Sequence, residues 1–136
     1  MKNNSSVIFD KKNSPQLFNE QQRKQLQHEI KLYLQRYGKE NLGKGADYCK
    51  VNICDDLLII RGEGYLTEPE KYIARTPSGR EKIRASRIEV IIAYWQDNKS
   101  YFEEKLQAKV VHHIYDLDPG NDFWMHTIMF DRQLTK

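Results

Sequence analysis

Two pairs of short β-type runs, separated by helical segments, constrain the fold of this chain more than any other feature. Each pair surrounds a turn sequence: 48–53 and 57–65 around Asp55-Asp56, and 109–117 and 123–130 around Asp118-Pro119-Gly120-Asn121. Acidic residues, proline and glycine between apolar runs are typical of β-hairpin turns. The chain is therefore expected to form two antiparallel hairpins.

Helical signals stand before the first pair and between the two pairs. Ser14 and Pro15 suit a helix start, and an apolar stripe from Phe18 to Tyr37 leads to Gly38, which could end that helix. The clearest local signal is Thr67-Glu68-Pro69-Glu70, a capping box with proline in the first turn. It predicts a short helix that begins at Glu68.

A longer helix is expected from about residue 80 to residue 107, after the break at Thr76-Pro77-Ser78-Gly79. The resulting order is α-ββ-αα-ββ, without a βαβ phosphate-binding unit. This order predicts an α+β fold of two layers, with a four-stranded, mainly antiparallel sheet packed against helices. We expect a flexible N-terminal arm over residues 1–13 and a single α+β domain over residues 14–136.

Length and charge exclude several classes of protein. In 136 residues, no apolar run approaches the ~20 residues of a membrane-spanning helix, and no signal segment opens the chain. These features predict a cytoplasmic protein that does not insert into the membrane. The net charge of +3 is spread along the chain and is too small to indicate nucleic-acid binding.

The candidate binding residues are cationic or lie in a glycine-rich loop. In the segment from Gly38 to Gly45, the Gly43-Lys44-Gly45 sequence could turn backbone amides towards an anion, although a helix C-cap followed by a connector is favoured. Arg61 interrupts an apolar strand, and Arg87 lies among apolar neighbours of the long helix. Buried arginines usually need a carboxylate, which Glu63, Glu68 or Glu70 could supply; otherwise an external anion would serve.

Histidines are the weak candidates for a metal site. If the second hairpin closes symmetrically around Pro119-Gly120, His113 lies directly opposite His126. Zinc normally needs a third protein ligand, and none stands at a recognisable spacing, so histidines without a metal are favoured. No catalytic triad or Cys-His signature is present either. The sequence therefore predicts no catalytic residues, no cofactor and no metal.

The region from about Gln21 to Asp131 resembles the MpsC family, the third component of a bacterial sodium-translocating membrane potential-generating system. The resemblance is carried by several short motifs: Leu42-Gly43-Lys44-Gly45, Asp55-Asp56-Leu57-Leu58-Ile59-Ile60, Tyr65-Leu66-Thr67-Glu68-Pro69-Glu70-Lys71, Gly79, Arg87, Val110-Val111, Asp116-Leu117-Asp118-Pro119 and Phe130. It implies an accessory to a membrane system linked to cation flux, membrane potential and inorganic carbon uptake. The Asn- and Lys-rich arm and the His112-His113 pair depart from the family pattern.

Three classes of function follow from the sequence. The first is a non-enzymatic accessory protein that binds a protein partner, with a membrane transport complex as the first candidate. The second is a nucleic-acid-binding regulator, and the third a ligand sensor or small enzyme. We also expect a homodimer, formed through a hairpin edge or an aromatic surface around Trp95 and Phe102. Such a protein would sit in the cytoplasm and reach the inner membrane through its partner.

Overall fold

A computed structural model describes residues 16–136, so the expected arm over residues 1–13 lies outside the described part of the chain. The elements follow the predicted order: α1 (Glu20–Leu42), β1 (Tyr48–Cys54), β2 (Leu57–Glu63), α2 (Glu68–Ile73), α3 (Pro77–Leu106), β3 (Val110–Asp118) and β4 (Phe123–Phe130). The α+β fold predicted from the sequence is confirmed.

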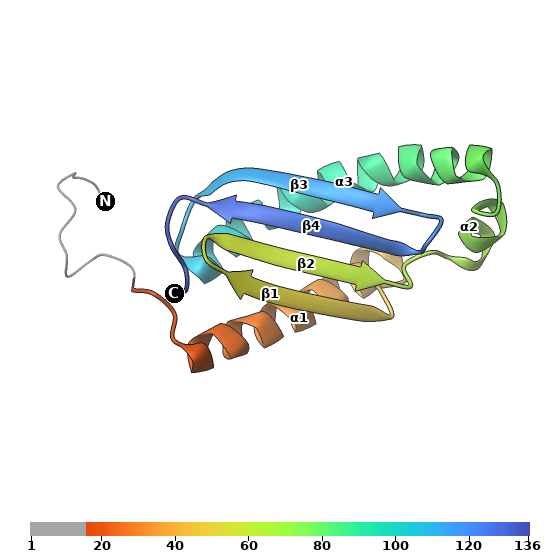
Figure 1. The fold of residues 1–136 in the computed structure, drawn as a ribbon. Helices are drawn as coiled ribbons and strands as arrows, with labels where there is room; N and C mark the ends of the chain where they lie inside the picture. The colour runs from red at the N-terminus through yellow and green to blue at the C-terminus, as the bar shows by residue number, and fades with distance from the viewer. Residues whose placement is uncertain (1–15) are drawn as a thin grey trace.

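The four strands form one antiparallel sheet in the order β1-β2-β4-β3 (Figure 1). The two hairpins join along β2 and β4, where Ile60 pairs with His126. The second strand of each hairpin is therefore central, and β1 and β3 are the edges.

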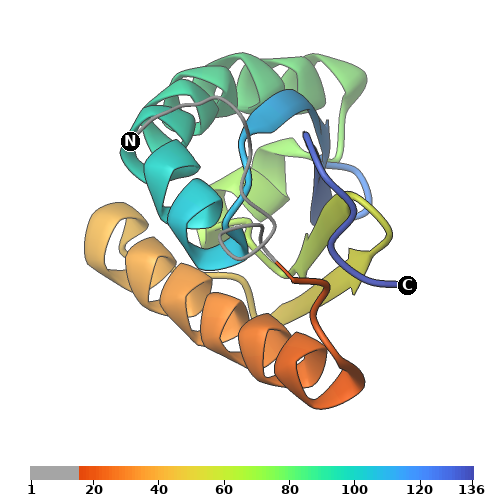
Figure 2. The ribbon, with the colours of Figure 1, turned by 90° about the vertical axis from the view of Figure 1, so that its left-hand side faces the viewer.

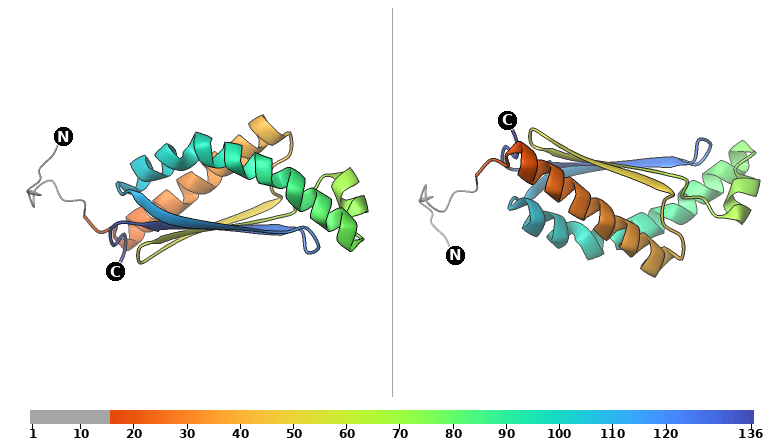
Figure 3. Two further views of the ribbon diagram at one scale, coloured as in Figure 1. Left: turned by 90° about the horizontal axis from the view of Figure 1, so that it is seen from above. Right: turned by 90° about the horizontal axis from the view of Figure 1, so that it is seen from below.

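Within residues 16–136, the helices cover one face of this sheet and leave the other face bare (Figure 3). Seen from the end where α1 begins and the C-terminus lies, α1 and the C-terminal part of α3 are neighbours on the same side of the strands (Figure 2). The Tyr33 and Tyr101 rings stack between them with centroids 3.6 Å apart. None of the helices within residues 16–136 has the length and apolarity needed to cross a membrane.

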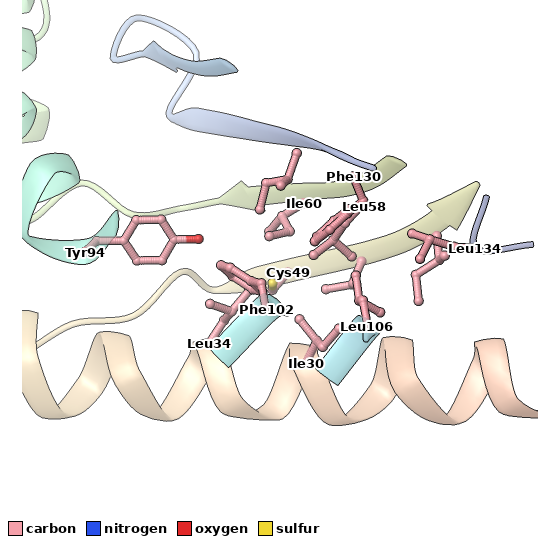
Figure 4. Close-up of a cluster of buried hydrophobic side chains, with 13 residues drawn as sticks. Ile30, Leu34, Cys49, Leu58, Ile60, Tyr94, Phe102, Leu106, Phe130 and Leu134 are labelled. Atoms are coloured by element: carbon pink, nitrogen blue, oxygen red, sulfur yellow. The ribbon is translucent and has the colours of Figure 1, made fainter. Parts of the chain in front are cut away.

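The core lies between these helices and the covered face of the sheet. Phe102 and Leu106 of α3 and Ile30 of α1 meet Leu58 and Ile60 of β2, and all five side chains are fully buried (Figure 4). Strand alternation explains this division, because every second residue of β1 and β2 points to the helices.

The ends of α1 differ from those predicted. The helix begins at Glu20 with an Asn19–Gln22 capping box, and the predicted start at Ser14-Pro15 lies outside the described residues. It continues through Gly38 and ends at Gly43, whose φ of 75° lies in the left-handed region that favours glycine. Gly38 has another role, because a Cβ there would lie 3.0 Å from the Cα of Gly45.

The start of α2 was predicted correctly. Thr67 caps the helix at Glu68, and the Glu70 side chain accepts a hydrogen bond from the Thr67 backbone N–H at 2.9 Å. The next helix, α3, starts at Pro77 with Thr76 as its cap, a few residues earlier than predicted. Gly79 is required at this junction, since a Cβ there would lie 1.7 Å from the carbonyl oxygen of Ile73.

The predicted register of the second hairpin was wrong by two residues. His126 pairs with Tyr115, and His113 pairs with Ile128, rather than the two histidines facing each other directly. The turn spans four residues, 119–122, and is not centred on Pro119-Gly120. Asp122 adopts a left-handed φ of 55° at its end, and its carboxylate accepts hydrogen bonds from the Tyr65 and Leu66 backbone amides.

Candidate functional site

A cavity of about 80 Å³ lies between the C-terminal half of α1, the segment after it, α3 and the covered face of the sheet. Its walls are mainly apolar and aromatic: Leu34, Gln35, Tyr37, Gly38, Leu42, Lys44, Gly45, Ala46, Cys49, Tyr65, Arg87, Val90, Ile91, Tyr94, Tyr115, Leu117 and Trp124. Hereafter "the cavity" means this set. An apolar pocket with a few polar groups is the usual form of a small-molecule site.

The aromatic wall depends on a glycine. Trp124 of β4 stacks on Tyr115 of β3, with centroids 5.7 Å apart and planes 15° apart. On the other side, Trp124 pairs with Gly62, where a Cβ would lie 2.3 Å from the Trp124 Cε2 atom. Gly62 therefore lets the indole ring lie flat against β2.

Arg87 reaches the cavity from α3 and is held by Glu70 of α2. The Arg87 Nε donates to Glu70 Oε2 at 3.0 Å and Nη2 donates to Glu70 Oε1 at 2.6 Å. Nη2 also donates to the Tyr65 carbonyl oxygen at 3.3 Å. Burial raises the pKa of Glu70, but the hydrogen bonds from Arg87 and from the Thr67 backbone outweigh it and leave this pKa below its usual value. The predicted pairing of Arg87 with a nearby glutamate is confirmed.

Lys44 holds the segment after α1 against the end of β2. Its Nζ donates to the Gly64 carbonyl oxygen at 2.5 Å, to the Gly45 carbonyl oxygen at 3.3 Å and to Asp47 Oδ1 at 3.0 Å. An ammonium group has three donors, so these contacts use all of them. Gly43 is the C-cap of α1 and does not line the cavity.

Arg61 lies elsewhere. It projects from the bare face of the sheet and forms an ion pair with Glu63 at 2.6 Å, with about half of its side chain exposed (53%). Of the candidate binding residues, the structure thus brings Lys44, Gly45 and Arg87 together at the cavity. It separates Arg61 and Gly43 from them.

The two histidines are neighbours despite the changed register. His113 Nδ1 and His126 Nε2 are 3.0 Å apart, and His126 Nδ1 lies 3.0 Å from the Tyr94 hydroxyl. In a self-consistent arrangement, Tyr94 donates to His126 and His126 donates to His113. Burial, followed by the charge of His113, lowers the pKa of His126 to about 3. Within residues 16–136, no group of three or more His, Cys, Asp or Glu side chains could hold a metal ion.

The bare face of the sheet is the second distinctive surface, and we call it the open face. Strand alternation and pairing assign its members: Tyr48, Lys50, Asn52 and Cys54 on β1; Leu57, Ile59, Arg61 and Glu63 on β2; Phe123, Met125, Thr127 and Met129 on β4; and His112, Ile114, Asp116 and Asp118 on β3. Ile114 is 60% exposed, and Met129 is also exposed. The predicted aromatic dimer surface is wrong, because Phe102 is fully buried in the core.

Sequence reasoning missed the aromatic wall of the cavity. Tyr115, Leu117 and Trp124 were assigned to strands, but not to a common pocket with Tyr65 and Tyr94. The signal was present in the alternation of the second hairpin, which places Tyr115, Leu117 and Trp124 on one face. Because Tyr65 and Tyr94 lie outside this hairpin, only the tertiary fold shows that all five residues line one cavity.

Two comparisons relate the chain to known proteins. The family model described as "Na+-translocating membrane potential-generating system (MpsC)" matches residues 22–132. The Bacillus subtilis (strain 168) protein named "Uncharacterized protein YrhF" is 30% identical over 108 residues, which cover 79% of this chain and 88% of that protein. No solved structure gives a significant match.

Proposed function

Because the chain belongs to the MpsC family, we propose that it is a non-enzymatic accessory protein that acts by binding a protein partner. The family description points to a membrane complex that translocates Na+ as the source of that partner. In this proposal the protein works from the cytoplasm and reaches the inner membrane through the partner.

The observation that carries this proposal is the open face. An antiparallel sheet with one solvated face usually alternates apolar residues inward with polar residues outward. Here the outward positions include Leu57, Ile59, Ile114, Met125 and Met129. Contiguous exposed apolar side chains on a small protein typically mark an interaction surface.

Charges flank this apolar centre on opposite sides. Lys50 and Arg61 lie towards β1, and Asp116 lies on β3, in the same cross-strand row through Met125. A partner with the opposite arrangement of charges would be favoured and oriented. The expected homodimer would use the same surface, because a twofold axis parallel to the strands would bring Lys50 against Asp116.

Affinity purification from membrane and cytosolic fractions tests the proposal. The wild-type chain and an Ile92→Lys control, altered at an exposed position of α3, should retain a subunit of a Na+-translocating complex, whereas Ile114→Lys should lose it. Light scattering on the purified chain tests whether a second copy of the chain, in a homodimer, covers the open face instead. Equal retention by the Ile114 variant would contradict the role of the open face.

The non-enzymatic part of the proposal has its own test. Purified protein is incubated with nucleotides, phosphoesters and bicarbonate, and turnover is followed. Turnover that is abolished by Arg87→Met or Lys44→Met, but not by a surface control such as Lys82→Met, would overturn it. A ligand-sensing regulator is the second candidate function, and the cavity favours it.

A further inference from the structure

We propose that the cavity binds a small planar aromatic molecule that carries one carboxylate group. This site is independent of the open face, which lies on the opposite side of the sheet. A failure of this inference would therefore leave the proposed protein partner untouched. The argument rests on the size of the cavity, the chemistry of its walls and two hydrogen-bond donors.

Size limits the ligand first. The volume of about 80 Å³ is about half of the ~150 Å³ that holds benzene in an enclosed apolar cavity, but this cavity is partly open to solvent, so one small ring can enter it from the open side. A nucleotide or an extended chain does not fit without a rearrangement of the walls. The Tyr115–Trp124 pair and Tyr94 present aromatic surfaces, which favour stacked or edge-on contact with a planar ring.

The charged side chains that line the cavity favour a negatively charged ligand. The only charged side chains among the described residues that line the cavity are Lys44 and Arg87, and no carboxylate lines it. Both cations would oppose a cationic ligand. The Lys44 donors are fully used by the fold, whereas the contacts of Arg87 use three of its five N–H groups. Arg87 is therefore the group that can donate to a carboxylate.

A second donor stands beside Arg87. The Tyr65 side chain is only 5% exposed, and its hydroxyl is buried without a hydrogen-bond partner within residues 16–136. The Arg87 Cζ atom lies 5.1 Å from the Tyr65 ring centroid, so both residues belong to one region of the wall. An unpaired buried hydroxyl is destabilising, and a ligand carboxylate that accepts its hydrogen bond would offset this cost.

Three probes of similar size and different charge test this inference on the full chain: benzoate, benzamide and benzylammonium. Binding is followed by calorimetry and by the indole N–H signals of Trp124 and Trp95, since Trp124 lines the cavity and Trp95 does not. We expect benzoate to shift the Trp124 signal and to bind at least about tenfold tighter than benzamide, because its charged hydrogen bonds are stronger. Benzylammonium should not bind.

Two variants and one control locate the site. Tyr65→Phe should remain folded and weaken benzoate about tenfold, because it removes only the unpaired hydroxyl. Val90→Phe fills the cavity and should abolish binding, whereas Ile88→Phe, on an exposed position of the same helix, should not. The inference is overturned if no probe binds, if the three probes bind equally, or if Val90→Phe leaves benzoate binding unchanged.

Discussion

His126 should make the protein sensitive to mild acid. Its side chain is fully buried, and its pKa falls from the ordinary 6.5 to about 3. Because the folded-state pKa is lower than the unfolded-state pKa, the unfolded chain takes up the proton first. Stability is therefore complete above about pH 6.5 and is lost as the pH falls towards 3.

The linkage between proton binding and folding gives the size of this loss of stability. At pH 5 the unfolded imidazole is almost fully protonated and the folded one is not, so the free energy of unfolding should fall by about 2 kcal/mol relative to pH 8. Glu70 and Asp118 have lowered pKa values and titrate below this window. His113 adds to the loss in the same direction, because burial and nearby His112 and Lys99 lower its pKa.

Urea unfolding followed by tryptophan fluorescence at pH 8, 7, 6 and 5 measures this dependence. His126→Gln should reduce the loss between pH 8 and pH 5 to less than about 1 kcal/mol, since the main titrating group is gone. His28→Gln, at an exposed position of α1, is the matched control and should keep the loss of the wild type. The reasoning is refuted if wild type and His126→Gln lose the same stability over this range.

Three further substitutions test local features by urea unfolding. Thr67→Ala should cost about 1 kcal/mol through the loss of the α2 cap, and an unchanged midpoint would contradict that role. Arg87→Met should lower the free energy of unfolding by about 2–4 kcal/mol, because it leaves the largely buried Glu70 carboxylate without its cation. Adding Glu70→Gln should restore much of this stability, and no restoration would argue against the ion pair. Gly62→Ala should cost about 1–3 kcal/mol and change the near-ultraviolet circular dichroism of Trp124, because the new Cβ overlaps the ring; an unchanged spectrum would refute the close approach.

The helices and strands could be predicted from local sequence patterns, because the signal for each one lies in residues that are close together in the chain. The capping box at Thr67 and the alternation around Asp55-Asp56 are complete within short windows of sequence. The end of α1 was misplaced because two glycines could end it. In the structure Gly43 ends the helix in a left-handed conformation, whereas Gly38 makes room for the close approach of Gly45.

Tertiary contacts explain what the sequence did not predict. The second hairpin turns over four residues that end at Asp122, whose carboxylate accepts hydrogen bonds from the backbone after β2, far away in sequence. The pairing of Arg87 with Glu70 was among the predicted options, because a capped helix places Glu70 near its start. In contrast, Arg61 and Arg87 were grouped because each is a charged residue among apolar neighbours, and the strand alternation places Arg61 on the opposite face of the sheet.

Site-specific photo-crosslinking in cells that naturally contain this protein tests the central claim most directly. A photoreactive residue replaces Ile114 on the open face or, as a control, Gln96 on the exposed side of α3. The account predicts that position 114, but not position 96, forms a covalent adduct with a subunit of a Na+-translocating membrane complex. An adduct from position 96 alone, or adducts only between copies of this chain, would contradict it.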